Sequence, residues 1–196
     1  MDYLNVNSVK YISILCIAMI FGCKKSGSVD STKQNNAQII QRFKGKYSIV
    51  SATSNQPVDV NLDGTKSSDM LQEIPDLKNS YLELRISDDL KVNNLAQSWQ
   101  NQHFPYESKP TAYDPKFSVL YANQVTAGLF NFNNNLTRLE VFNTDTTYHK
   151  DFPLPKLVEV IANDQIHIPT EKTLYTRSGM VHVIIDVIYK RFTTAL

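Results

Sequence analysis

The segment Met180-Val-His-Val-Ile-Ile-Asp-Val-Ile-Tyr-Lys190 decides the fold class, because β-branched and aromatic residues fill it and neither glycine nor proline interrupts it. Apolar residues occupy both faces of this segment from Val181 to Ile188, which predicts a central and well covered strand. It follows the turn residues Ser178-Gly179, and Thr173-Leu-Tyr-Thr176 before them has the same character. The two segments together predict a β-hairpin.

The same two-residue period recurs towards the N-terminus in short segments separated by small polar turns. Strands are predicted at 46–54, 81–86, 117–121, 125–132, 136–142, 157–161 and 165–168. The spacing of Ile39, Ile40 and Phe43 predicts a short helix that ends at Gly45. No helix is long enough to serve as a crossover between parallel strands, so we expect an all-β, antiparallel sheet. An up-and-down barrel, or alternatively a β-sandwich, would protect the edges of such a sheet.

The N-terminal segment predicts export. An apolar run from Tyr11 to Phe21 follows Lys10, and this run is about half of the roughly 20 residues that a membrane-spanning helix needs. The run ends in Ile20-Phe21-Gly22-Cys23, which resembles the bacterial lipobox, where a small residue precedes a cysteine that becomes diacylated and then N-terminal. The resemblance implies a signal peptide at 1–22 and lipidation of Cys23. The alternative is an ordinary secretory signal in which the cysteine is incidental.

The chain after the signal peptide divides into a tether and one domain. Residues 23–36 are polar without an apolar pattern, which predicts a flexible tether. Residues 37–196 are long enough for a single all-β domain with its own core. By resemblance to lipoprotein sorting rules, the absence of Asp directly after Cys23 implies the outer membrane. We therefore expect a cell-envelope protein that its lipid chains anchor to a membrane.

Composition and cysteine usage exclude several functions. The net charge is +1, with 20% charged residues, so the basic excess of a nucleic-acid-binding protein is missing. Both cysteines, Cys16 and Cys23, precede the predicted domain, which therefore has no disulfide, cysteine nucleophile or thiolate metal ligand. The sequence also contains no phosphate-binding glycine loop, dinucleotide fingerprint or nucleophile elbow. We expect a protein without enzymatic activity.

One motif has the spacing of a metal site. The run Asp59-Val-Asn-Leu-Asp-Gly-Thr-Lys-Ser-Ser-Asp69 has oxygen ligands at alternate positions and resembles the start of EF-hand and dockerin loops. The twelfth position, which closes a calcium loop with a bidentate carboxylate, is Met70. Asx-rich sequences also form ordinary turns, so the motif predicts either a calcium loop or a plain turn. The candidate calcium ligands are Asp59, Asn61, Asp63, Thr65, Ser67 and Asp69.

Three segments carry a family resemblance. Gly45-Lys-Tyr-Ser-Ile-Val-Ser51, the run from Asp59 to Glu73 and the closing segment from Val183 to Arg191 are similar to lipocalin-like domains of small Gram-negative envelope lipoproteins. The resemblance implies a lipocalin-like barrel that binds a small apolar or amphipathic ligand. The 9 Phe and 10 Tyr residues are numerous enough to line a cavity as well as to fill a core.

Two functions remain open at this point. The first is a non-enzymatic module that binds a small ligand inside the barrel, and the second is a structural lipoprotein with a solid core that contacts another envelope protein. The stretch from Ala96 to Pro115 bears on this choice, because it is predicted to be a loop that contains Trp99, Phe104 and Tyr113. Its aromatic side chains either cap the mouth of a pocket or hold the loop against the core.

The lipid anchor is directly testable. We expect radiolabelled palmitate to be incorporated into the full chain, and Cys23→Ser to abolish this labelling, because Cys23 is the single predicted acylation site. The variant is also expected to leave the membrane fraction, since the acyl chains supply the membrane affinity. A Cys23→Ser variant that is labelled and fractionated like the parent contradicts the lipobox assignment.

Overall fold

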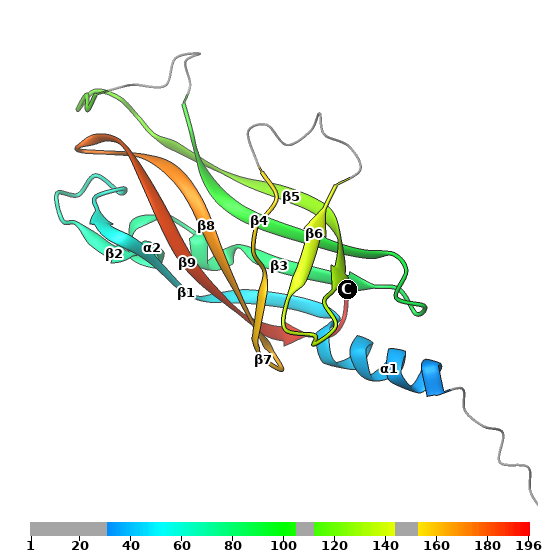
Figure 1. Cartoon of the computed structure of the whole chain (residues 1–196). Coiled ribbons are helices and arrows are strands. Elements are labelled where there is room, and N and C mark those ends of the chain that lie inside the picture. Colours follow the sequence, from blue (N-terminus) through cyan, green and yellow to red (C-terminus); the bar gives the residue numbers. More distant parts are fainter. Residues whose placement is uncertain (1–30, 105–111, 144–152) are drawn as a thin grey trace, which may run out of the picture.

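The computed structural model describes residues 31–104, 112–143 and 153–196, which form one curled nine-stranded sheet with a helix at one end (Figure 1). Cys23 and the first part of the predicted tether lie outside the described residues. No helix in the described part of the chain is long and apolar enough to cross a membrane. The elements are α1 (Ser31–Phe43), β1 (Gly45–Val58), β2 (Ser67–Asp69), α2 (Met70–Glu73), the 3-10 helix η1 (Leu77–Asn79), β3 (Tyr81–Ile86), β4 (Asn93–His103), β5 (Leu120–Phe132), β6 (Leu139–Phe142), β7 (Glu159–Ala162), β8 (Gln165–Thr176) and β9 (Gly179–Thr193).

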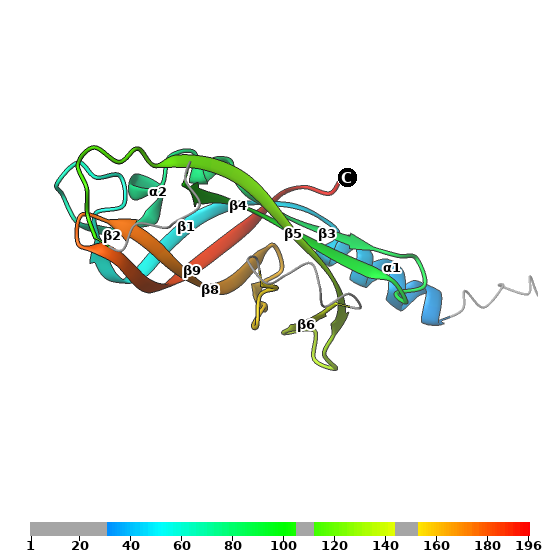
Figure 2. The same ribbon diagram turned by 90° about the horizontal axis from the view of Figure 1, so that it is seen from above.

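The strands follow an up-and-down order. Neighbours in the sheet are β6-β5-β4-β3-β1-β9-β8-β7, all antiparallel, and the short β2 pairs with β1. The first and last long strands, β1 and β9, are therefore paired in the middle of the sheet. The long strands are strongly twisted (Figure 2), as right-handed strand twist requires of a curled sheet. The all-β, antiparallel up-and-down prediction is confirmed, in the form of one continuous sheet and not the two sheets of a sandwich.

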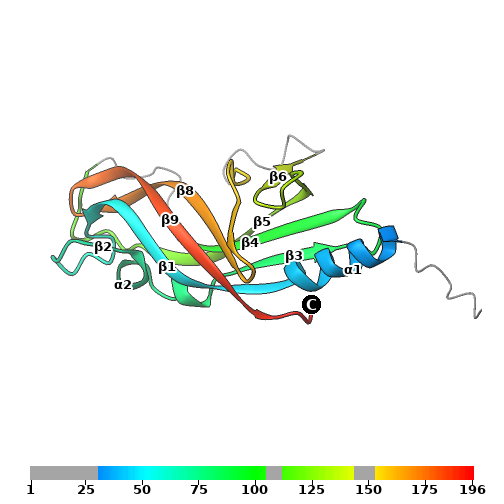
Figure 3. The same ribbon diagram turned by 60° about the horizontal axis from the view of Figure 1, so that its bottom comes forward.

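The two edge strands of the sheet meet at one point. The bridge between Arg138 and Glu159 joins the chain beside β6 to β7, and Figure 3 shows these two strands next to each other. The Leu139 N–H donates to the Val158 carbonyl at 2.9 Å, and the Val160 N–H donates to the Thr137 carbonyl at 2.8 Å. The sheet is thus a half-barrel whose edges make contact beside β6 and β7.

The two faces of strand β9 differ in burial. Val183, Ile185, Val187 and Tyr189 point inward and are fully buried, whereas Ile184 on the outer face is 40% exposed. The central position of β9, between β1 and β8, confirms the prediction made from its sequence. The prediction that both faces are covered is wrong, because the described helices leave the outer face of this strand open to solvent.

Helix α1 begins earlier than predicted. It starts at Ser31 rather than at Ala37, so residues 31–36, which were assigned to the tether, are helical. Ile39 and Phe43 anchor the helix in the core, and the Phe43 ring lies 4.9 Å from that of Phe132. The polar residues before them continue the helix, and the Asn36 side chain donates to the Asp88 carbonyl at 3.2 Å. Tertiary contacts therefore stabilise a polar helical turn that has no apolar pattern of its own.

Much of the predicted loop from Ala96 to Pro115 is strand. Strand β4 continues to His103, pairs with β3 on one side and β5 on the other, and buries Trp99 to 4% exposure. Its sequence, Asn-Asn-Leu-Ala-Gln-Ser-Trp-Gln-Asn-Gln-His, is poor in β-formers. Pairing on both sides overrides this low propensity. Phe104 and Tyr113 pack with Phe117 around the buried Tyr175, so they hold the end of the loop against the sheet.

Gly45 joins α1 to β1 and provides a test of this packing. Its φ is +146°, and a Cβ there would overlap the Thr193 carbonyl oxygen of β9. We expect Gly45→Ala to lower the free energy of unfolding by about 2 kcal/mol or more in urea denaturation, because strain and overlap add. The control Ser48→Ala on the same strand is expected to cost about 0.5 kcal/mol. Parent-like stability of Gly45→Ala would contradict the close approach of β9.

Candidate functional site

The inner face of the sheet carries polar residues on three strands. Near α1 it carries Leu95 on β4, Phe130 on β5 and Ile168 on β8, all buried in the core. Farther along each strand polar residues take several inward positions. These positions are Gln97 and Asn101 on β4, Gln124 and Thr126 on β5, and Thr170 and Lys172 on β8. Trp99 lies between the first two, and the buried Leu174 follows Lys172, so a polar region is enclosed within the hydrophobic interior.

This polar region borders a pocket of about 210 Å³, hereafter the interior pocket. Trp99, Asn101, Gln124, Thr126, Leu154 and Lys172 are among the residues that line it. The pocket reaches the edge of β8, because the outward-facing Glu171 and Ile184 also line it. The segment from Pro153 to Lys156 passes between β5 and β8 at its side: Leu154 lies against Gly128, where a Cβ would come within 2.7 Å of its Cδ2 atom. At the other end of the segment, Lys156 forms a 3.0 Å ion pair with Glu171 of β8.

Lys172 is the charged group of the interior pocket. Its Nζ donates to the Asn101 Oδ1 at 3.0 Å and lies 5.4 Å from the centre of the Trp99 ring. No carboxylate of the described residues forms an ion pair with it. Burial without a counter-ion lowers the pKa of the Lys172 ammonium to about 8.

Two further polar atoms at the interior pocket lack partners. Within the described ranges, neither the Trp99 Nε1 donor nor the Gln124 Oε1 acceptor makes a hydrogen bond, and both are buried. Trp99 and Gln124 are paired in register on β4 and β5, so the two groups are neighbours. A buried polar atom without a partner costs about 1–3 kcal/mol. Both atoms have less than 1 Å² of accessible surface, so the polar group that the interior pocket offers a ligand is the Lys172 ammonium.

In the candidate calcium loop, side-chain oxygens accept hydrogen bonds from backbone N–H groups of the same turn. The Asn61 Oδ1 accepts from the Asp63 N–H at 3.0 Å, and the Asp63 Oδ1 accepts from the Thr65 N–H at 2.7 Å. The Ser67 Oγ accepts from the Asp69 N–H at 2.9 Å, and Asp69 caps α2 by accepting from the Leu71 N–H at 3.0 Å. These are Asx and Ser turns, in which the oxygens point at nearby backbone and not at a common centre.

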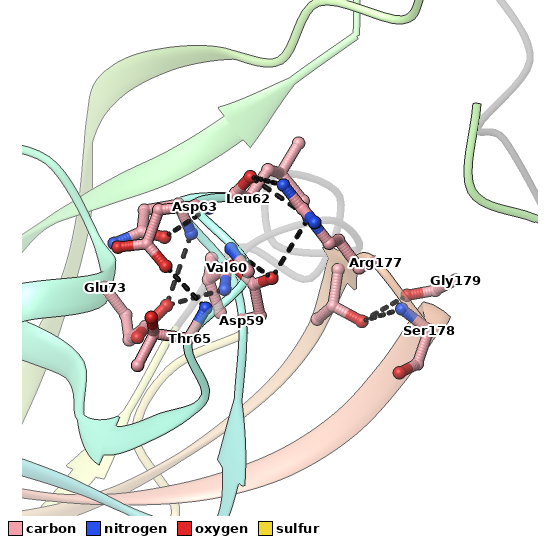
Figure 4. A network of polar contacts seen from close by, with 12 residues as sticks. Asp59, Val60, Leu62, Asp63, Thr65, Glu73, Arg177, Ser178 and Gly179 are labelled. Carbon is pink, nitrogen blue, oxygen red and sulfur yellow. Dashed lines mark hydrogen bonds and ion pairs between the residues drawn. The ribbon is translucent and has the colours of Figure 1, made fainter. Parts of the chain in front are cut away.

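The guanidinium group of Arg177 lies beside this loop. Arg177, in the turn between β8 and β9, donates to the Leu62 carbonyl at 2.7 Å and lies 3.3 Å from the buried Asp59 carboxylate (Figure 4). Glu73 accepts from the Val60 N–H at 2.7 Å, and burial raises the pKa of its carboxyl group. Among the described residues no group of three or more His, Cys, Asp or Glu side chains could hold a metal ion. In the structure the six candidate ligands belong to hydrogen-bonded turns, and Arg177 supplies a positive charge beside Asp59. Calcium binding by this loop stays a prediction.

Of the residues that line the interior pocket, the sequence identifies Trp99, as a candidate cap of a pocket mouth, and does not identify the polar ones. Lys172 and Thr170 interrupt the apolar alternation of β8, and this interruption caused two separate strands to be predicted where the structure has one. Polar residues at positions that should face the core are the sequence feature that could have indicated the pocket. No family model, curated protein or solved structure matches the chain.

The lowered pKa of Lys172 makes stability depend on pH. Between about pH 8 and pH 10.5 the folded state holds this amine neutral while the unfolded state still protonates it, so stability rises with pH. We expect the parent to gain free energy of unfolding relative to Lys172→Met, up to about 3 kcal/mol for the whole interval. Urea titrations from pH 7 to about 9.5 test this, since ionisation of buried tyrosines acts in the opposite direction above about pH 10. Parallel curves would contradict a buried, unpaired Lys172.

The loop assignment also has a direct test. We expect millimolar calcium to leave the melting temperature of the parent unchanged, because a cation that does not bind cannot stabilise the folded state. Asp63→Ala is expected to lose about 1 kcal/mol from its turn, equally with and without calcium. Stabilisation of the parent by calcium that Asp63→Ala abolishes would contradict the assignment.

Proposed function

We propose that this protein is a lipid-anchored envelope protein that binds a small amphipathic molecule in the interior pocket of its curled sheet. The observation that carries the proposal is the group of polar, inward-facing residues on β4, β5 and β8 that line one pocket. A core built only for stability would continue the apolar pattern of Leu95, Phe130 and Ile168. Polar residues placed there weaken the packing and are retained in natural proteins mainly at functional sites.

The lining of the interior pocket suits an amphipathic ligand. The Trp99 ring and the Leu154 side chain offer apolar surface, while Lys172, Asn101 and Gln124 offer charge and hydrogen bonds. Binding sites for small molecules generally combine such an apolar lining with a few polar groups. A wholly apolar ligand would make no hydrogen bond with Lys172, so it fits less well.

The volume limits the size of the ligand. About 210 Å³ corresponds to roughly seven water molecules in the liquid and is below the roughly 300–1,000 Å³ of pockets for drug-sized ligands. The ligand we propose therefore has on the order of 10 non-hydrogen atoms. A long acyl chain would need space in the hydrophobic core, where Leu95, Phe130 and Ile168 are 0–1% exposed.

Blocking the interior pocket tests the proposal. In Thr126→Phe an aromatic ring would enter the pocket, whereas in the control Ala127→Phe the ring lies on the exposed outer face of the same strand. The full chain is purified in a detergent whose molecules are too large for the pocket, and bound small molecules are then extracted. We expect extracts of the parent and of Ala127→Phe to contain the ligand. We expect extracts of Thr126→Phe to lack it.

Mass spectrometry of the extracts is the readout. Equal amounts of the same small molecules in all three proteins, or none in the parent, would contradict ligand binding in the interior pocket. Retained melting temperatures in both variants establish that neither result comes from unfolding.

A further inference from the structure

We infer that the ligand of the interior pocket is a small organic acid, whose carboxylate contacts Lys172. This inference rests on the proposed function and specifies its chemistry. It follows from a lysine that lines the interior pocket, donates to Asn101 and has no carboxylate partner among the described residues.

Lys172 calls for an anion. An ammonium group has three donors, and the Asn101 Oδ1 accepts one of them at 3.0 Å. The neighbouring Lys156 is already paired with Glu171, whereas Lys172 has no carboxylate partner in residues 31–104, 112–143 and 153–196. A ligand anion would supply the missing counter-charge and accept the remaining hydrogen bonds, which are stronger when both partners are charged.

Trp99 places apolar surface beside that anion. Its ring centre lies 5.4 Å from the Lys172 ammonium, so a ligand that contacts Lys172 also lies near the aromatic ring. A carboxylate has two oxygens that can accept the remaining Lys172 hydrogens. A phosphate would bring a charge of about −1.5 to −2 against a single ammonium, which favours the singly charged acid.

The lining indicates the body of the ligand. Trp99 and Leu154 offer apolar surface in the pocket that Lys172 lines. The contacts therefore describe an acid with an apolar body, within the size limit set by the 210 Å³ pocket.

A matched pair of probes tests the inference. 4-Hydroxybenzoate has a carboxylate and an apolar body. In 4-hydroxybenzamide a neutral amide group replaces the carboxylate, and the rest of the molecule is the same. We expect isothermal titration of the full chain to give at least about tenfold tighter binding of the acid at pH 7. The preference is expected to diminish above about pH 8, by up to tenfold per pH unit, as Lys172 loses its proton.

Two lysine variants assign the effect to one side chain. Lys172→Met is expected to lose at least about tenfold in affinity for the acid and to bind both probes alike. Lys190→Met, which removes an exposed lysine of β9, is expected to keep the preference of the parent. Removal of a buried unpaired charge should not unfold the protein, and melting curves of both variants verify this.

The outcomes separate the inference from the proposed function. Equal affinity of the parent for acid and amide, or an unchanged acid preference in Lys172→Met, overturns the organic-acid assignment and leaves a binding pocket in place. Failure of both probes to bind the parent at millimolar concentration, together with empty extracts, overturns the organic-acid assignment and the proposed function alike.

Discussion

The structure depends on the backbone pairing of its first long strand with its last. Strands β1 and β9 pair from Lys46–Thr193 to Ser54–Ile185, with register shifts after Lys46 and after Ile49. The other main pairs join strands adjacent in the chain, so β1–β9 is the contact that joins two meanders into one curled sheet. The bridge at Arg138 and Glu159 is too short to do so alone. Such non-local pairing is costly in chain entropy and forms slowly, but once formed it defines an inside and an outside for every other strand.

The interior combines one hydrophobic core with a polar region. Tyr47, which donates to the Phe43 carbonyl at 2.6 Å, belongs to a buried cluster that also includes Leu174. Burial of this cluster supplies the hydrophobic stabilisation of the sheet. Lys172 and Trp99 can then remain with unmet hydrogen-bonding capacity. The stability of the core thus permits a costly but specific arrangement at the pocket.

The sequence predicts the elements whose own residues favour their conformation. It does not predict the elements whose conformation depends on contacts with residues distant in the chain. Strand β9 was identified because Val and Ile dominate it, whereas β4 was missed because Asn and Gln give it low propensity and its strand neighbours impose the conformation. The metal-like spacing from Asp59 to Asp69 is real as a turn, but the cation beside it, Arg177, comes from a turn between two later strands that no spacing rule reveals. For the interior pocket the sequence does contain a signal, the polar residues Thr170 and Lys172 in an apolar alternation. Polarity at these positions predicts the end of a strand. In the structure the strand is continuous there and faces the pocket.

The central claim is that Lys172 faces the interior pocket, partly buried and without a carboxylate partner among the described residues. The most direct measurement is an NMR titration of its side-chain Cε and Nζ resonances in the ligand-free full chain, assigned by their loss in Lys172→Met. Burial predicts a pKa of about 8 for this ammonium. A pKa near the ordinary lysine value of about 10.4 would place Lys172 in solvent or beside a carboxylate and would contradict the account.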